Sequence, residues 1–306
     1  MVRIIQNLVA FGLLVLATMS HAEPLQRIQV AENIYALIGP MEQRSPENLA
    51  NNANFGFIVG NDGVVLIDSG GTLLGAKAIE ARIRAVTDKP VVLVINTGGQ
   101  DHRWFGNAYF SALGADTLTS EQTLADQQAR GSSEADKTSR YTQANWAGTE
   151  PQIAQRTIAE PTDLTVAGIQ LKLIPVGPAH TGGETLVWLP DSGVLFSGDV
   201  VYMDRMLGVG PQSQHKAWID AFAEIQALQP KVIVPGHGQP TDLAGAERDT
   251  LRYLTFLREK IGALIEEGED ISAAASLDQS QFSYLKVYPQ IHKRNAQRVF
   301  GEMEWE

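Results

Sequence analysis

The stretch that decides the fold runs Asn96-Thr97-Gly98-Gly99-Gln100-Asp101-His102-Arg103-Trp104-Phe105-Gly106-Asn107. It follows residues 91–95, Val-Val-Leu-Val-Ile, a β-branched apolar run that is typical of a buried strand. Two adjacent glycines then allow backbone angles that other residues avoid, and a carboxylate and an imidazole come directly after them. Loops at the ends of buried strands are where α/β proteins place their chemistry. Taken alone, the stretch also fits a simpler interpretation, a polar turn with a solvated Asp-His pair.

Three later strand ends repeat the design of this loop. Residues 177–183 read Gly-Pro-Ala-His-Thr-Gly-Gly, residues 197–199 read Ser-Gly-Asp, and residues 235–238 read Pro-Gly-His-Gly. Each places a side chain of metal-ligand type just beyond an apolar run, with glycine beside it. We therefore expect five side chains to converge on one metal site: Asp101, His102, His180, Asp199 and His237.

Imidazole and carboxylate donors suit zinc, and they also suit iron or manganese where oxygen ligands are numerous. A metal held by three or four such groups lowers the pKa of bound water to about 7 and so supplies hydroxide at neutral pH. Within this set Asp199 is the candidate for bridging two ions. Asp101 is the candidate for ligation or for orienting the nucleophilic water, and is therefore the candidate catalytic residue.

The remaining chain predicts alternating strands and helices. Asp62-Gly63 is a strong hairpin signal between two apolar runs. Asp68, at the end of the second run, is expected to hold loop amides. The expected strands are 28–38, 55–60, 64–68, 91–95, 158–166, 169–176, 185–189, 194–196 and 231–234, and the expected helices are 76–86, 120–146, 218–228, 244–267 and 290–303.

The N-terminus has the pattern of a secretory signal peptide. Arg3 precedes an uncharged apolar run at 8–19, and Ser20-His21-Ala22 places small residues at a cleavage site before Glu23. Residues 1–22 are thus expected to be removed, and residues 23–306 to form a single secreted or periplasmic domain without a membrane span. The chain has no cysteine and a formal net charge of −11, which argues against nucleic acid or an anionic membrane as its main partner.

The order of the strand ends resembles the metallo-β-lactamase fold superfamily over nearly all of residues 28–260. The motifs that carry the resemblance are Asp68-Ser69-Gly70, Asn96-Thr97, Gly106-Asn107 and the three strand ends around His180, Asp199 and His237. The resemblance implies an α/β fold, a four-layer αββα sandwich with a metal site at one edge of its two sheets. A helical tail is expected from about residue 245.

The family's loop, Thr-His-x-His-x-Asp-His, is altered here. Anchored on Thr97, its first two histidines fall on Gly98 and Gln100, and its Asp and last His fall on His102 and Arg103. A one-residue slip instead aligns Asp101 and His102 with that last pair, and we favour the slip. The resemblance then implies one tightly bound ion, zinc before iron or manganese, held by Asp101, His102, Asp199 and His237, with Gln100 as a weak ligand at most.

The leading functional hypothesis is a secreted hydrolase whose metal-bound hydroxide attacks an ester, thioester, lactone or amide of a small molecule. Asp199 resembles the aspartate of glyoxalase-II-like hydrolases, and the chain lacks the cysteine that one β-lactamase subclass has there. One alternative is a non-hydrolytic binding or accessory protein with a degenerate metal site, and another is redox chemistry at a single iron. Arg103 is expected to be a surface charge, and Tyr202 is expected to pack or to face the pocket. His215 and His292 lie outside any metal-site pattern, and we expect no special role for them.

Overall fold

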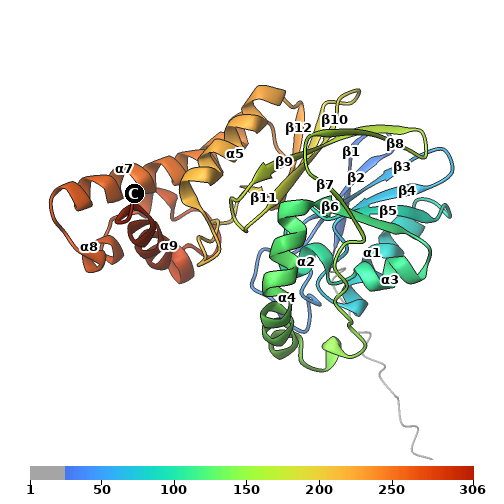
Figure 1. Ribbon diagram of the computed structural model, residues 1–306, viewed down its shortest axis with the longest axis horizontal. Coiled ribbons are helices and arrows are strands. Elements are labelled where there is room, and N and C mark those ends of the chain that lie inside the picture. The colour runs from blue at the N-terminus through green and yellow to red at the C-terminus, as the bar shows by residue number, and fades with distance from the viewer. Residues whose placement is uncertain (1–24) are drawn as a thin grey trace, which may run out of the picture.

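The computed structural model describes residues 25–306, so the expected signal peptide lies outside the described residues. Two β-sheets pack face to face and carry helices on their outer faces, as Figure 1 shows. This is the expected four-layer αββα sandwich. The first sheet has the strand order β1-β2-β3-β4-β5-β6-β7, and the second has the order β12-β11-β10-β9-β8.

The first sheet changes direction at β4. Strands β1 to β4 pair antiparallel, and β4 to β7 pair parallel. The expected strand 28–38 is instead a hairpin, because Asn33 takes a positive φ of 59° and turns the chain. The strands are β1 (Gln26–Ala31), β2 (Ile34–Ile38), β3 (Phe55–Val59), β4 (Val64–Ile67), β5 (Val91–Ile95), β6 (Asp116–Ser120) and β7 (Arg156–Ile158).

The second sheet is antiparallel except for the pair β11 and β12. Its parallel pair matters for the site, because Asp199 lies in β11 and His237 ends β12. The strands are β8 (Thr162–Val166), β9 (Ile169–Gly177), β10 (Glu184–Leu189), β11 (Val194–Tyr202) and β12 (Val232–His237).

Helices cover both outer faces and the edge that carries the site. Ile79 and Ile83 of α1 pack on the first sheet, and Trp218 and Phe222 of α5 pack on the second. The principal helices are α1 (Leu73–Arg84), α2 (Asp101–Trp104), α3 (Asn107–Ala112), α4 (Glu121–Thr142), α5 (His215–Leu228), α6 (Leu243–Ala246), α7 (Arg252–Glu266), α8 (Ile271–Ala275) and α9 (Tyr288–Met303).

A buried apolar cluster between the sheets fixes their stacking. Val65, Ile95, Leu173 and Phe196 contribute to it from four strands, and each is at most 2% exposed. Burial of such side chains contributes roughly 1.5–3 kcal/mol each, so this cluster sets where the strand ends meet. The carboxyl ends of β5, β11 and β12 consequently open at one edge of the sandwich.

Candidate metal centre

The altered loop is held in place by a pair of asparagines. Asn107 Nδ2 donates to Asn96 Oδ1 at 2.8 Å, and Asn96 Nδ2 donates to the Arg103 carbonyl at 2.8 Å. Between them the chain forms the single helical turn α2, with Gln100 as its N-cap residue. One turn of helix aims consecutive side chains in different directions, so Asp101, His102 and Arg103 reach different partners.

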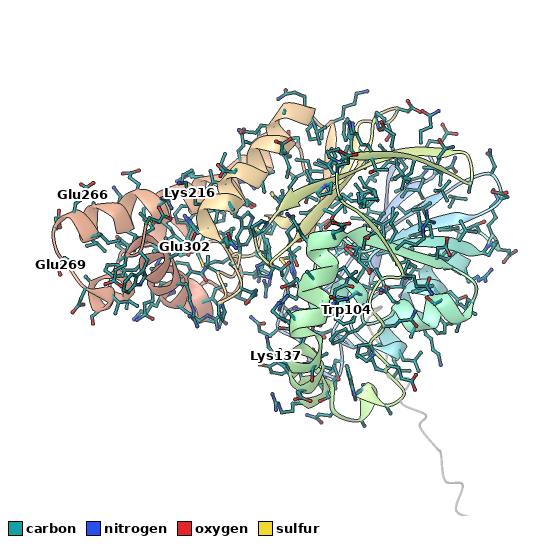
Figure 2. The ribbon with its side chains drawn as sticks, viewed as in Figure 1. Trp104, Lys137, Lys216, Glu266, Glu269 and Glu302 are labelled. Atoms are coloured by element: carbon teal, nitrogen blue, oxygen red, sulfur yellow. The ribbon has the colours of Figure 1, made fainter. Side chains whose placement is uncertain are left out.

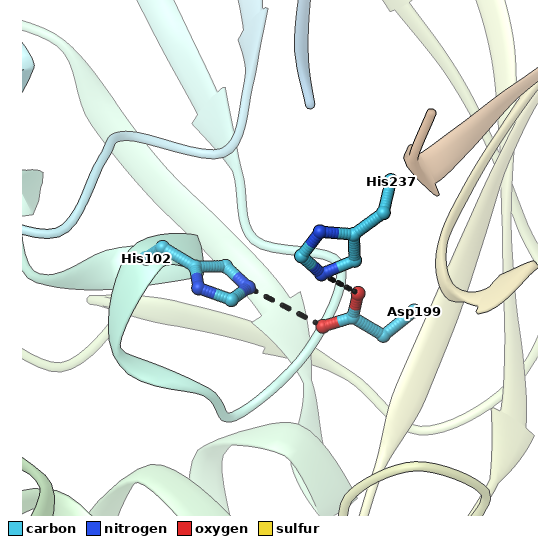
Figure 3. Close-up of side chains that lie close together, drawn as sticks. All are labelled: His102, Asp199 and His237. Atoms are coloured by element: carbon cyan, nitrogen blue, oxygen red, sulfur yellow. Dashed lines mark hydrogen bonds and ion pairs between the residues drawn. The ribbon is translucent and has the colours of Figure 1, made fainter. Parts of the chain in front are cut away.

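Three of the five expected side chains come together as a group with metal-ligand geometry. His102, Asp199 and His237 are all buried, and one ligand atom from each lies within 4.8 Å of the others. His102 Nε2 lies 3.4 Å from Asp199 Oδ2, and His237 Nε2 lies 3.2 Å from Asp199 Oδ1 (Figure 3). Two imidazoles and a carboxylate are donors that fit zinc or iron.

Asp199 also binds the guanidinium of Arg103. Arg103 Nη2 donates to Asp199 Oδ1 at 2.7 Å, and its Nη1 donates to Asp68 Oδ2 at 2.9 Å. Arg103 is 1% exposed, so the expected surface charge is in fact buried. Burial raises the pKa of Asp199, but the Arg103 charge and the two imidazoles outweigh burial and hold that pKa well below its usual range. Asp199 is therefore ionised.

Asp68 performs the structural role expected of it. Its carboxylate accepts hydrogen bonds from the Thr97 backbone N–H at 2.7 Å and from Thr97 Oγ1 at 2.8 Å. Through the hydrogen bonds with Thr97 and the ion pair with Arg103, Asp68 connects the end of β5 to the residue that pairs with Asp199.

Asp101 does not join the three-residue group, contrary to the slipped register. Its carboxylate forms an ion pair with Arg44 and accepts a hydrogen bond from Thr138 Oγ1 at 2.5 Å. Within the altered loop, the two residues that contact Asp199 are His102 and Arg103. These are the two residues that the ungapped register aligns with the Asp and the last His of the family's loop. What Asp101 does reach is the far side of the His102 ring, where its Oδ1 lies 3.3 Å from Nδ1.

His180 and Gln100 are directed at each other. The Gln100 side-chain amide lies 2.9 Å from His180 Nε2, and His180 Nδ1 lies 2.9 Å from the Gly208 carbonyl. The structure therefore brings His180 to the edge of the site and not into the group of three.

Glu184 fills the space beside Gly98. A Cβ on Gly98 would lie 2.5 Å from Glu184 Oε2, so a histidine at this position would collide with that carboxyl. Glu184 is fully buried, and its Oε1 accepts hydrogen bonds from the Thr181 N–H at 2.9 Å and from Thr181 Oγ1 at 2.7 Å. Burial and the nearby Asp199 charge raise the pKa of Glu184 well above its usual value. The position of the family's first histidine therefore has neither the imidazole nor the space for one.

The imidazoles are held in the form that binds metals. Desolvation by burial lowers the pKa of His102 to about 4 and that of His180 to about 4. It also places the pKa of His237 well below its ordinary value. Tyr202 stacks on His237 with ring centroids 4.6 Å apart and fixes the ring plane.

The group lies at one end of a cavity of about 530 Å³, which Gln100, His102, His180, Tyr202 and His237 line at that end. Tyr202 thus both packs and faces the cavity. Three residues in contact with this region lacked a signal in the sequence: Arg44, Glu184 and Arg205. Each comes from a segment far from the altered loop, so only the folded chain shows where it lies.

No helix in residues 25–306 is long and apolar enough to cross a membrane.

The comparisons with known proteins agree with this architecture. The model of the metallo-beta-lactamase superfamily matches residues 50–237. The chain belongs to this superfamily.

Three curated relatives are about a quarter identical to the chain over the aligned residues. They are the 2,4-dinitroanisole O-demethylase subunit alpha of Nocardioides sp. (strain JS1661), 26% identical over 59% of this chain and 51% of its own length; the linear primary-alkylsulfatase of Pseudomonas sp. (strain ATCC 19151), 24% identical over 63% and 44%; and the metallo-beta-lactamase type 2 of Elizabethkingia meningoseptica, 25% identical over 68% and 77%. The chain thus spans about half the length of the first two.

Solved structures show the same fold. A metallo-beta-lactamase from Pontibacter korlensis superposes with a TM-score of 0.61 at 21% identity, covering 76% of this chain and 99% of its own. A metallo beta lactamase from Hirschia baltica superposes with a TM-score of 0.60 at 17% identity, covering 76% and 98%.

Proposed function

We propose that this chain is a metal-dependent hydrolase of a small molecule and that it holds one tightly bound divalent ion, zinc, between His102, Asp199 and His237. The observation that carries the proposal is the buried group of these three side chains at the end of a cavity, in a member of the metallo-beta-lactamase superfamily. When bound, such an ion supplies Lewis acidity and lowers the pKa of a bound water. The bond cleaved belongs to an ester, thioester, lactone or amide.

Asp101 orients His102 in this proposal instead of binding the ion. Two groups lie near His102 Nδ1: Arg44 Nη2 at 3.2 Å, which can only donate to it, and Asp101 Oδ1 at 3.3 Å, which can only accept from it. The proposal requires the contact with Asp101, because only a ring that carries its proton on Nδ1 keeps the Nε2 lone pair free for a metal. Carboxylates behind ligating histidines commonly fix the ring and its tautomer. Arg44 in turn forms an ion pair with Asp101 and fixes the carboxylate.

We propose no ion at the place where the family's two-metal enzymes hold their first ion. Gly98 offers no donor, Glu184 occupies the neighbouring space, and Gln100 and His180 are directed at each other. These contacts support one ion per chain.

The experiment is a measurement of metal per chain by mass spectrometry on protein purified without added metal. About one equivalent of zinc is expected in the wild type, and none in His237→Ala. His292→Ala is the matched control, because His292 stacks on Tyr288 outside the site and should keep its metal. Two tightly held ions would contradict the proposal.

Hydrolysis of an ester, thioester, lactone and amide panel should be abolished by the neutral chelator 1,10-phenanthroline and restored by zinc. One iron per chain would instead favour the redox alternative. The binding-protein alternative is favoured by one observation, the neutralisation of Asp199 by Arg103 without any metal. Metal-free wild type that binds a ligand regardless of the chelator would establish it.

The proposal includes export to the periplasm or the medium. It rests on the N-terminal pattern of residues 1–22, which lies outside the described residues. Sequencing the N-terminus of the mature protein from a periplasmic fraction tests it, and the expected first residue is Glu23.

A further inference from the structure

The cavity beside the candidate metal centre has the size and the lining of a binding site for a small organic molecule. Its volume of about 530 Å³ is in the range of sites that enclose a small organic molecule. One end is the histidine end described above. The rest of the lining comes from α4 and α9, which lie on different parts of the molecule in Figure 1, and from residues 208–212.

The lining is strongly basic, although the whole chain is acidic. Glu134 is its one acidic residue, whereas the formal net charge of the chain is −11. Such a concentration of one sign of charge in a concave surface attracts ligands of the opposite sign. The basic residues that line the cavity are Arg44, Lys137, Arg205, Arg294 and Arg298.

Only one of these five charges is already neutralised by a carboxylate. Arg44 forms an ion pair with Asp101, and the acidic Glu134 forms its own ion pair with Arg130 at 3.1 Å. The other four basic side chains make no ion pair with any residue in the described part of the chain. Within residues 25–306, four of the five positive charges in the lining therefore lack a carboxylate at ion-pair distance.

Arg205 is the most unusual of the four because it is buried. It is 6% exposed, and its Nε donates to the Met41 carbonyl at 2.7 Å. A buried guanidinium without a paired carboxylate is costly, and an anionic ligand would offset that cost. Arg205 follows Met203 by two residues, and the Met203 N–H donates to the His237 carbonyl at 2.9 Å, which places Arg205 toward the histidine end.

The remaining three cations come from α9 and α4. Gln290, Arg294 and Arg298 are spaced four residues apart in α9, so they share one face of that helix, and all three line the cavity. Lys137 comes from α4 and is labelled in Figure 2. The positive charge is thus divided between Arg205 and this group on α9 and α4.

We propose that the cavity binds a small organic molecule with at least two anionic oxygen groups, carboxylate, sulfate or phosphate, one held by Arg205 and another by Arg294, Arg298 and Lys137. This inference rests on the proposed function, since it names the substrate class of the same site. A ligand held at both points lies along the cavity, and the anionic group held by Arg205 is the one nearer to His102 and His237. Guanidinium groups suit this role because they bind oxyanions through two parallel hydrogen bonds.

Calorimetric titration of metal-free protein tests the proposal separately from the metal. The metal is removed with 1,10-phenanthroline, which is itself uncharged, and the probe is propane-1,2,3-tricarboxylate at low salt. Wild type should bind this probe, should not bind the neutral triamide of the same skeleton, and should bind more weakly as sodium chloride is added. Since no metal is present, a failure of the hydrolase proposal leaves this result unchanged.

The decisive variant is Arg294→Gln with Arg298→Gln. Both side chains are exposed, so the fold should be retained, and the affinity for the tricarboxylate should fall roughly tenfold or more, because two charged donors to the anionic group are lost. The matched control is Lys293→Gln with Lys260→Gln, which removes the same charge from α9 and α7 outside the cavity and should leave the affinity within about twofold.

Single anions test the two-point arrangement. Inorganic sulfate and inorganic phosphate should bind more weakly than the tricarboxylate, because each reaches only one end. Equal affinity in the wild type and in the α9 double variant would overturn the proposal. So would binding of the triamide as tight as that of the tricarboxylate, or no binding of the tricarboxylate at all.

Discussion

Arg103 and Asp199 form an ion pair at 2.7 Å beneath the metal centre, and both side chains are 1% exposed. The same guanidinium pairs with Asp68 at 2.9 Å and donates to the Asn54 carbonyl at 2.8 Å. It thereby joins the end of β4, in the first sheet, to β11, in the second. Without Arg103, two buried carboxylates would lie close together at the edge of the sandwich, with no cation between them.

Replacing Arg103 with Gln should therefore destabilise the fold strongly. We expect the free energy of unfolding to fall by about 3–5 kcal/mol, because the change leaves buried charge without a partner. Arg103→Lys should be damaging as well, since a single ammonium cannot donate to both carboxylates and to a carbonyl in one plane. Urea titration followed by circular dichroism measures the effect.

Arg156→Gln is the control for this prediction. Arg156 also forms an ion pair, with Asp116 at 3.1 Å, but the two side chains are 59% and 60% exposed. Its loss should change stability by less than about 1 kcal/mol. If Arg103→Gln were as stable as Arg156→Gln, the structural role of the buried pair would be wrong.

Asp101→Asn should weaken metal binding, although Asp101 is not itself a ligand in the proposal. An amide carries no negative charge, so it accepts the His102 Nδ1–H more weakly than the carboxylate does, and we expect metal affinity to fall about 10–100-fold. Competition with a chromophoric chelator gives that affinity. Thr138→Val is the matched control, because it removes a hydrogen bond to the same carboxylate but leaves the contact with His102 in place. An affinity in Asp101→Asn as high as that of Thr138→Val would argue against an orienting role.

Gly98→Ala should destabilise the protein through Glu184. The new Cβ would lie 2.5 Å from Glu184 Oε2, and that carboxyl is held by Thr181 in a buried pocket, so we expect a loss of about 1–3 kcal/mol. The loss should be smaller when Gly98→Ala is made in a Glu184→Ala background. Gly301→Ala in α9 is the control, since nothing lies within 4 Å of its added Cβ. Additive effects of the two substitutions would show that the collision is not the cause.

The fold and the place of the site could be predicted from the sequence because they depend on local patterns. Apolar runs that end in glycine next to a ligand-type residue located His102, Asp199 and His237, and the helical spacing located the principal helices. The direction of a side chain within a one-turn helix is not local information. Asp101 and Arg103 both differ from their expected environments, because Arg44, some 57 residues away, reaches Asp101, while the buried carboxylates Asp68 and Asp199 attract Arg103.

Glu184 should make the protein less stable as the pH rises. Its pKa in the folded protein is raised well above 4.5, chiefly by burial, so the folded state keeps its proton while the unfolded chain releases it. Its contribution to stability is complete below about pH 4.5 and declines as the pH rises toward the pKa of the folded state. Glu184→Gln has no such proton to lose, so the free energy of unfolding of the wild type should fall relative to that of this variant between pH 5 and 8. Parallel urea titrations across this range measure the difference, and parallel pH profiles for the two proteins would mean that Glu184 is ionised in the folded state.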